Sequence, residues 1–180
     1  MLLQELFQTS AYPWEWAEKT GDRWSAVFEF ERPTQPGEPR LVKQEYVVTF
    51  YLKSINHITS GATDEAKEIL LSQRKPDGSY YKYEDKMWDM EFGNIDMRGY
   101  KNFGLRGSEQ ALPIFSTIVD IAKKFVQEKQ PPAIFFFGFN RQQSSFYGSL
   151  LKQIGKRLPG FKVVVIPEYL NTPAYILMKE

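Results

Sequence analysis

Large aromatic side chains recur at every second position in several segments, and this spacing constrains the fold more than any other feature of the sequence. The rings concerned are Trp14, Trp16, Trp24, Phe28, Phe30, Tyr46, Phe50, Trp88 and Phe92. Successive side chains of a β-strand point to opposite faces, so a period of two places such rings on one face of a sheet. The spacing therefore predicts a sheet face packed by large rings, rather than an aromatic platform for a ligand.

The first half of the chain is predicted to consist mainly of antiparallel strands. The expected strands cover residues 12–19, 23–32 and 40–54 and a segment that ends near Phe92. Thr20-Gly21-Asp22 is a turn sequence, so the first two strands should form a hairpin. A helix at residues 1–8 and another at 64–73, which Thr63 or Asp64 can cap, complete this half.

The second half alternates between helical and strand patterns. The expected elements are helices at 108–129 and 144–158 and strands at 133–139, 158–168 and 171–179. The β-α-β crossover should make its two strands parallel, and the last two strands should close an antiparallel hairpin. We therefore expect one α/β (α+β) domain with helices packed on a mixed, mostly antiparallel sheet. Its antiparallel strands would occupy residues 1–93, and the strand–helix–strand–helix–hairpin half residues 94–180.

Composition excludes several classes of function. A chain of 180 residues with 42% apolar residues can build the core of a single domain. It has no cysteine and one histidine, so thiol chemistry and metal sites with two histidine ligands are excluded. The formal charge of +1 makes nucleic acid an unlikely partner. No apolar run is long enough for a membrane span, so we expect no membrane partner.

The order of elements from Trp88 onward resembles that of the GNAT acetyltransferase superfamily. In that fold a strand leads through a glycine-bearing turn into a helix whose N-terminus holds the coenzyme A pyrophosphate. A parallel strand, a second helix and a closing hairpin follow. Asn140 and Tyr147 have the spacing of a pattern on the second helix, with Phe146 in place of leucine, and Gly160-Phe161 follows late.

This resemblance implies a set of candidate site residues for transfer of acetyl from acetyl-CoA to an amine. The cofactor would be held by Arg106, Gly107, Ser108 and Asn140. Tyr147 would be the general acid and Glu91 a possible base, since a positioned phenol can protonate a departing thiolate. A helix tyrosine packed inward is the commoner role of a residue at such a position.

The residues of the candidate turn are poorly suited to bind a pyrophosphate. Small residues at a helix N-terminus let backbone N–H groups approach the diphosphate. If Gly107 is the first glycine of the pattern, Glu109 takes the place of the second. Two like charges about 4 Å apart cost roughly 1 kcal/mol in water and more near a protein surface. This argues against a working cofactor site, although acids are also favoured in a first helical turn.

Across most of its length the chain resembles a family of uncharacterised tailed-bacteriophage proteins. The segments that carry the resemblance are LQELFQTSAYPWEW, ALPIFSTIVDIAKKFV, AIFFFGF and SSFYGSLL. The resemblance implies a viral protein located in the virion or in the bacterial host cytoplasm, with a phage structural or host protein as partner.

Two other groups of residues need an interpretation. Asp89 and Glu91 share a strand face, with Asp96 nearby, and could act as a base or hold a hard cation. A solvated strand face is the commoner meaning of such alternation. His57 is expected to be a surface residue. The basic and aromatic segment 72–86 has a composition found where single strands of nucleic acid stack on rings, but acidic residues follow it at once.

The leading functional hypothesis is a phage-encoded accessory or virion-associated protein that uses a GNAT-like scaffold for protein interaction without catalysis. The alternatives are an N-acetyltransferase that uses acetyl-CoA, and an inhibitor of a bacterial host protein.

Overall fold

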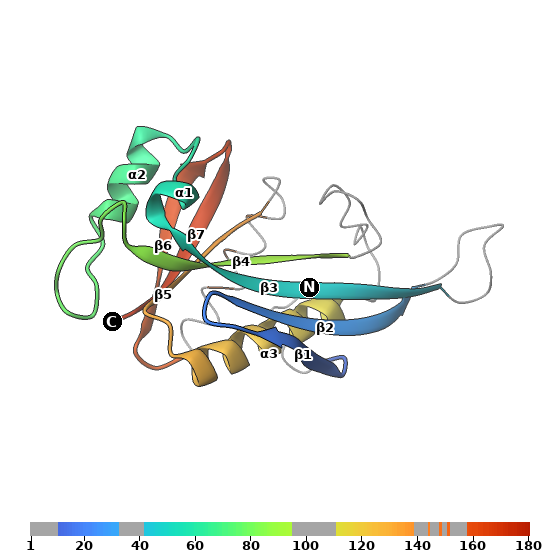
Figure 1. Cartoon of the computed structure of the whole chain (residues 1–180). Helices are drawn as coiled ribbons and strands as arrows, with labels where there is room; N and C mark the ends of the chain where they lie inside the picture. Colours follow the sequence, from blue (N-terminus) through green and yellow to red (C-terminus); the bar gives the residue numbers. More distant parts are fainter. Residues whose placement is uncertain are drawn as a thin grey trace. The chain divides into compact units, whose positions relative to one another are not determined.

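The computed structural model describes residues 11–32, 42–94, 111–138, 144, 148, 151 and 158–180 (Figure 1). The chain forms two compact units, each built from two segments. Unit 1 comprises Met1–Phe50 and Glu91–Lys129, and unit 2 comprises Tyr51–Met90 and Gln130–Glu180. The expected division of a single domain near residue 94 stays a prediction, as does the helix at residues 1–8, which lies outside the described residues.

Seven strands and three helices have defined bounds in the described residues. They are β1 (Trp14–Lys19), β2 (Arg23–Arg32), β3 (Val42–Ser54), α1 (Ile55–Ile58), α2 (Asp64–Leu71), β4 (Lys86–Asn94), α3 (Ala111–Lys129), β5 (Ala133–Phe137), β6 (Phe161–Tyr169) and β7 (Thr172–Lys179). The strand order is β1-β2-β3-β4-β5-β7-β6.

The expected GNAT-like α/β (α+β) fold class is wrong, because the described chain is plainly richer in sheet than such a layout. Helices α1 and α2 have only 4 and 8 residues, whereas β2 and β3 have 10 and 13. The physical reason is the alternation of aromatic and β-branched residues with polar ones, which favours pleated, half-buried strands. The resemblance rested on the order of elements, and that order does not determine how much of the chain is helical.

The directions of strand pairing agree with the sequence-based expectations. Strands β1 and β2 are antiparallel, with Trp14 opposite Phe28. Strands β4 and β5 are parallel where Trp88 pairs with Ile134. Strands β6 and β7 form the closing antiparallel hairpin. Its two-residue turn, Leu170-Asn171, has positive φ angles of 48° and 67°, as a type I′ hairpin turn requires.

The core of unit 1 is the predicted aromatic sheet face, covered by α3. Phe50 of β3 stacks on Phe125 of α3, with ring centroids 3.9 Å apart and planes 4° from parallel. Trp24 of β2 meets Phe125 edge-on at 5.5 Å, and Trp16 meets Trp24 edge-on at 5.2 Å. The rings are therefore packing groups, as the period-two spacing indicated.

Polar contacts fix how α3 lies along β1 in unit 1. The Tyr12 backbone N–H donates to Thr117 Oγ1 at 2.8 Å, and the Trp14 indole N–H donates to Asp120 at 2.9 Å. Lys19 forms an ion pair with Glu128, about two helical turns beyond Asp120. Three contacts spaced along one side of α3 hold the helix against β1.

Unit 2 has its own apolar core beneath α1 and α2. The buried members are Ile55, Ile58, Ala62, Ala66, Leu70, Tyr81, Met87, Ala133, Phe135, Ile166, Tyr169, Ala174, Ile176 and Met178. Side-chain caps begin both helices: Ser54 Oγ accepts from the His57 N–H, and Thr63 Oγ1 accepts from the Ala66 N–H. Each cap gives an acceptor to a backbone N–H of the first helical turn.

Replacement of Phe125 by alanine should destabilise the protein by about 3–5 kcal/mol, because it removes a fully buried ring and leaves a cavity. Chemical denaturation of the Phe125→Ala variant measures this change. Tyr83→Ala is the matched control: Tyr83 is 43% exposed, so its loss should change the free energy of unfolding by no more than about 0.5 kcal/mol. Equal losses in the two variants would contradict the assignment of Phe125 to the core.

Candidate functional site

Most of the candidate site residues taken from the acetyltransferase resemblance lie outside the described residues. These are Arg106, Gly107, Ser108, Asn140 and Tyr147. Glu91, the possible base, lies on β4 in unit 1 with a partly buried side chain. His57 is exposed in α1, as expected of a surface residue. The assignments to cofactor binding and catalysis stay predictions.

The expectation of a solvated acidic face on β4 is wrong for Asp89. Its residue surface is only 5% exposed. The cause is its neighbour on β3: Lys53 Nζ lies 2.6 Å from Asp89 Oδ2, and the lysine side chain is itself three-quarters buried. A charge buried in a sheet needs a partner of opposite sign, since desolvation of a lone carboxylate is very costly. Asp89 is therefore part of a buried ion pair in unit 2.

A tyrosine lies beside this ion pair. The Tyr169 hydroxyl donates to the Ile58 carbonyl oxygen, and its ring contacts Phe135 and Phe137. Burial raises the pKa of Tyr169 to about 12; the Asp89 carboxylate adds to this effect and the Lys53 ammonium opposes it. Since its hydroxyl is engaged and its pKa is high, Tyr169 serves packing rather than proton transfer near neutral pH.

A hydroxyl network occupies the end of β5 in unit 2. Ser144 Oγ lies 3.1 Å from the Gly138 carbonyl oxygen and 2.9 Å from that of Pro173. Thr172 Oγ1 donates to the Gly138 carbonyl at 2.9 Å, and the Tyr175 hydroxyl donates to the Ser144 carbonyl at 2.6 Å. The network is buried and each of its hydroxyls has an acceptor, so at these residues the junction after β5 is a structural connection.

Gly148 shows how closely the segment after β5 packs on β7. A Cβ atom at this position would overlap the ring and hydroxyl of Tyr175. Ser144, Gly148 and Leu151 are all helical and buried, and their spacing places them on one helix face. This agrees with the helix expected at residues 144–158, although the other residues of that segment before Leu158 lie outside the described ones.

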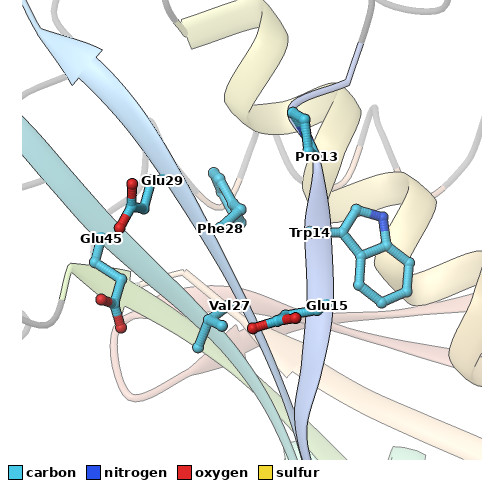
Figure 2. Close-up of a pocket in the computed structure, with 7 residues that line it drawn as sticks. All are labelled: Pro13, Trp14, Glu15, Val27, Phe28, Glu29 and Glu45. Atoms are coloured by element: carbon cyan, nitrogen blue, oxygen red, sulfur yellow. The ribbon is translucent and has the colours of Figure 1, made fainter.

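A groove of about 520 Å³ opens on unit 1 over the first three strands. Its lining residues are Pro13, Trp14, Glu15, Val27, Phe28, Glu29 and Glu45. Figure 2 shows Glu15 and Trp14 leaving β1 in opposite directions, with the Glu15 carboxylate directed towards Val27 of β2. The register explains this arrangement, because Glu15 lies directly opposite Val27.

The groove is acidic. Carboxylates from three neighbouring strands gather around Val27: Glu15 of β1, Glu29 of β2 and Glu45 of β3 (Figure 2). Glu29 has an ion pair with Lys43 at 3.5 Å, but both side chains are mostly exposed, so water screens this pair. Among the described residues no ion pair is formed by Glu15 or Glu45. The groove therefore attracts cationic groups.

The sequence does contain a pattern that indicates this groove, namely glutamates at the positions between the aromatic residues. Each strand that presents rings to α3 presents the intervening residues to its other face. Glutamates stand at these intervening positions: Glu15 between Trp14 and Trp16, and Glu29 between Phe28 and Phe30. The sequence indicates the burial of Asp89 only weakly, through a single acidic residue between Trp88 and Met90. Its partner Lys53 belongs to another strand, so local spacing could not identify it.

Two classes of site find no support in the described residues. Within those ranges no group of three or more His, Cys, Asp or Glu side chains could hold a metal ion. None of the helices that the structure describes combines the length and apolarity needed to cross a membrane.

Comparisons of the chain with protein-family models, with curated proteins and with solved structures give no match.

Removal of the Lys53 ammonium should destabilise the protein by about 2 kcal/mol or more, because it leaves the Asp89 carboxylate buried without that cation. The Lys53→Met variant tests this by denaturant unfolding, and the double variant Lys53→Met/Asp89→Leu should recover most of the loss. Lys67→Met is the control: its partner Asp64 is fully exposed, so the change should be below about 0.5 kcal/mol. A double variant less stable than Lys53→Met alone would contradict a buried pair.

The free energy of unfolding should fall as the pH rises from about 10 to about 12. The pKa of Tyr169 is raised from 10.0 to about 12 in the folded state, so the unfolded chain loses this proton first and is favoured in that interval. Tyr46 and Tyr81, whose pKa values burial also raises to about 12, contribute in the same direction.

Denaturation of the Tyr169→Phe variant at several pH values checks this dependence. At pH 7 it should be less stable by about 1 kcal/mol, because it lacks the hydrogen bond to Ile58. Its further loss between pH 10 and pH 12 should be smaller than that of the unmodified protein. Tyr80→Phe, at a 51% exposed position, is the control variant, and an unchanged alkaline slope in Tyr169→Phe would refute the coupling.

Proposed function

We propose that this protein is a non-catalytic binding protein, and that the acidic groove of unit 1 recognises a cationic, partly apolar segment of a protein partner. The observation that carries the proposal is the gathering of Glu15, Glu29 and Glu45 around an apolar floor in one groove. Protein interaction was also the leading hypothesis from the sequence. The phage origin and the location in a virion or host cytoplasm stay predictions.

Charge supports a cationic occupant. The whole chain has a formal charge of only +1, so the acidity of the groove is local. A local field of this kind raises the association rate of an oppositely charged partner and disfavours a partner of like charge. Its effect on the binding affinity itself is smaller. Lysine or arginine side chains from a partner would reach the carboxylates of Glu15 and Glu45, which have no ion pair with any described residue.

The apolar surfaces support a partner with side chains to bury. Val27 is only partly buried, and Pro13 is exposed. The Trp14 ring does not add to the surface beside Glu15, because it leaves β1 on the opposite side, where its indole N–H donates to Asp120 of α3. Apolar side chains that water can reach gain free energy when a partner covers them.

Nucleic acid fits this groove poorly, since a phosphate backbone would face the three carboxylates of Glu15, Glu29 and Glu45. The acetyltransferase alternative is not carried forward. It depended on a fold class that the sheet content contradicts, and its cofactor residues lie outside the described part of the chain.

Calorimetric titration with short synthetic peptides tests the proposal. A peptide of alternating lysine and valine should bind, whereas its glutamate–valine counterpart should not. Binding should weaken at high salt, because the carboxylates are exposed to solvent. The triple variant Glu15→Gln/Glu29→Gln/Glu45→Gln should lose about tenfold in affinity, since exposed ion pairs contribute roughly 0.2–1 kcal/mol each.

The matched control variant is Glu65→Gln/Glu68→Gln/Glu168→Gln, which removes three exposed glutamates of unit 2. It should leave the affinity unchanged. If both triple variants lost affinity for the peptide equally, the effect would come from net charge alone, and the groove would not be the binding site. Tight binding of spermine with none of the valine peptide would instead assign the groove to a small polyamine.

A further inference from the structure

The register of the first hairpin changes within β1. Trp16 lies opposite Ala26, but Glu18 lies opposite Ser25, so β1 has one extra residue, Ala17, at this point. Such a β-bulge breaks the alternation of side chains along the strand, so the residues before it and after it follow opposite odd–even patterns. The bulge therefore decides on which face of the sheet the first residues of β1 place their side chains.

This bulge is what brings Glu15 into the acidic groove. Next to the turn that joins β1 to β2, Lys19 lies opposite Trp24. If that pairing continued without a bulge, Glu15 would lie opposite Phe28, on the face that packs on α3. With the bulge, Glu15 lies opposite Val27, and its carboxylate lines the groove (Figure 2).

The Lys19 side chain links the two sides of the bulge. Its ammonium lies 5.3 Å from the centroid of the Trp16 ring and 4.8 Å from that of the Trp24 ring, within the range of a cation–π interaction. Trp16 stands before the bulge and Lys19 after it. In a regular strand, side chains three residues apart lie on opposite faces, so one ammonium reaches both rings only when the extra residue is present.

The groups around the Lys19 ammonium are themselves held in place. The Trp24 indole N–H donates to the Thr20 carbonyl at 2.9 Å, and the Trp24 ring meets Phe125 edge-on. The ammonium also forms an ion pair with Glu128 of α3. Lys19 therefore joins β1, β2 and α3 at one point.

Strand β1 is the strand that most needs such support. It has 6 residues, lies at one end of the strand order, and among the described strands borders only β2. Short segments at the edge of a structure open locally at a smaller free-energy cost than the whole fold. A contact that exists only in the bulged register raises the cost of leaving that register.

We propose that Lys19 is a positioning residue for the acidic groove: its ammonium stabilises the bulged register of β1 and so keeps Glu15 beside Glu29 and Glu45. This role rests on the proposed function, which gives the groove its cationic partner. Lys19 lies on the same face as Trp24, opposite to the face that carries Glu15. It therefore acts through the strand and not by touching the partner.

Titration of the lysine–valine peptide into variants of equal charge tests this role. Lys19→Met and Lys43→Met each remove one positive charge, so electrostatics alone predicts tighter binding of the peptide by both. We expect tighter binding only for Lys43→Met, because its ammonium is paired with Glu29 of the groove. Lys19→Met should instead bind about threefold more weakly. Lys19→Arg should bind as the unmodified protein does, since a guanidinium also stacks on rings and pairs with a carboxylate.

Deletion of Ala17 tests whether Lys19 acts through the bulge. In the shortened strand, regular pairing from the turn already brings Glu15 opposite Val27, so Lys19→Met should no longer weaken binding in this background. Hydrogen exchange of the β1 amides is a second measurement that needs no peptide. Exchange should be about fivefold faster in Lys19→Met than in the unmodified protein, and this difference should disappear when Ala17 is deleted.

The outcomes separate this role from the proposed function. If the unmodified protein does not bind the peptide, the proposed function fails, and hydrogen exchange alone decides whether Lys19 supports the register. If it binds, and Lys19→Met binds equally well or more tightly, the role of Lys19 is refuted while the groove stands. Equal weakening by Lys19→Met with and without Ala17 would show that Lys19 does not act through the bulge, and would overturn the proposal.

Discussion

Burial of one aromatic sheet face beneath a single long helix is the interaction on which the rest of unit 1 depends. Phe125 of α3 contacts Phe50 and Trp24, rings that belong to two different strands. The face that packs on α3 can bury several large rings because mostly polar residues occupy the alternate positions of its strands. The same alternation that builds the core therefore decides which side chains are left for binding.

That constraint gives the acidic groove its composition. Glu15 and Glu29 stand at positions where strand geometry forbids them to share a face with their aromatic neighbours. Contacts of α3 along β1, including those of Asp120 and Glu128, fix the strand that carries Glu15 and Trp14. A partner would thus meet a surface whose rigidity comes from the core on the other side of the strands.

Charged residues in the two units have different roles, although both occur on strands. Asp89 is buried with Lys53 in unit 2, where the pair can exist only because both charges are present. Glu15 and Glu45 are accessible in unit 1 and have no ion pair with any described residue. Because it is buried, the Asp89–Lys53 ion pair affects the stability of unit 2. The carboxylates of Glu15 and Glu45 can be reached by solvent, so they are the ones that our proposal assigns to recognition.

The sequence by itself determined the strands, their hairpins, the ring-bearing face and the apolar stripe of α3, because these follow from local periodicity. The fold class inferred from the order of elements was wrong, since that order does not limit the proportion of sheet. Only the tertiary structure decided that Asp89 is buried and that three glutamates from separate strands share one groove. Each of these depends on strand register and neighbours, and a register shift of one residue would reverse every such assignment.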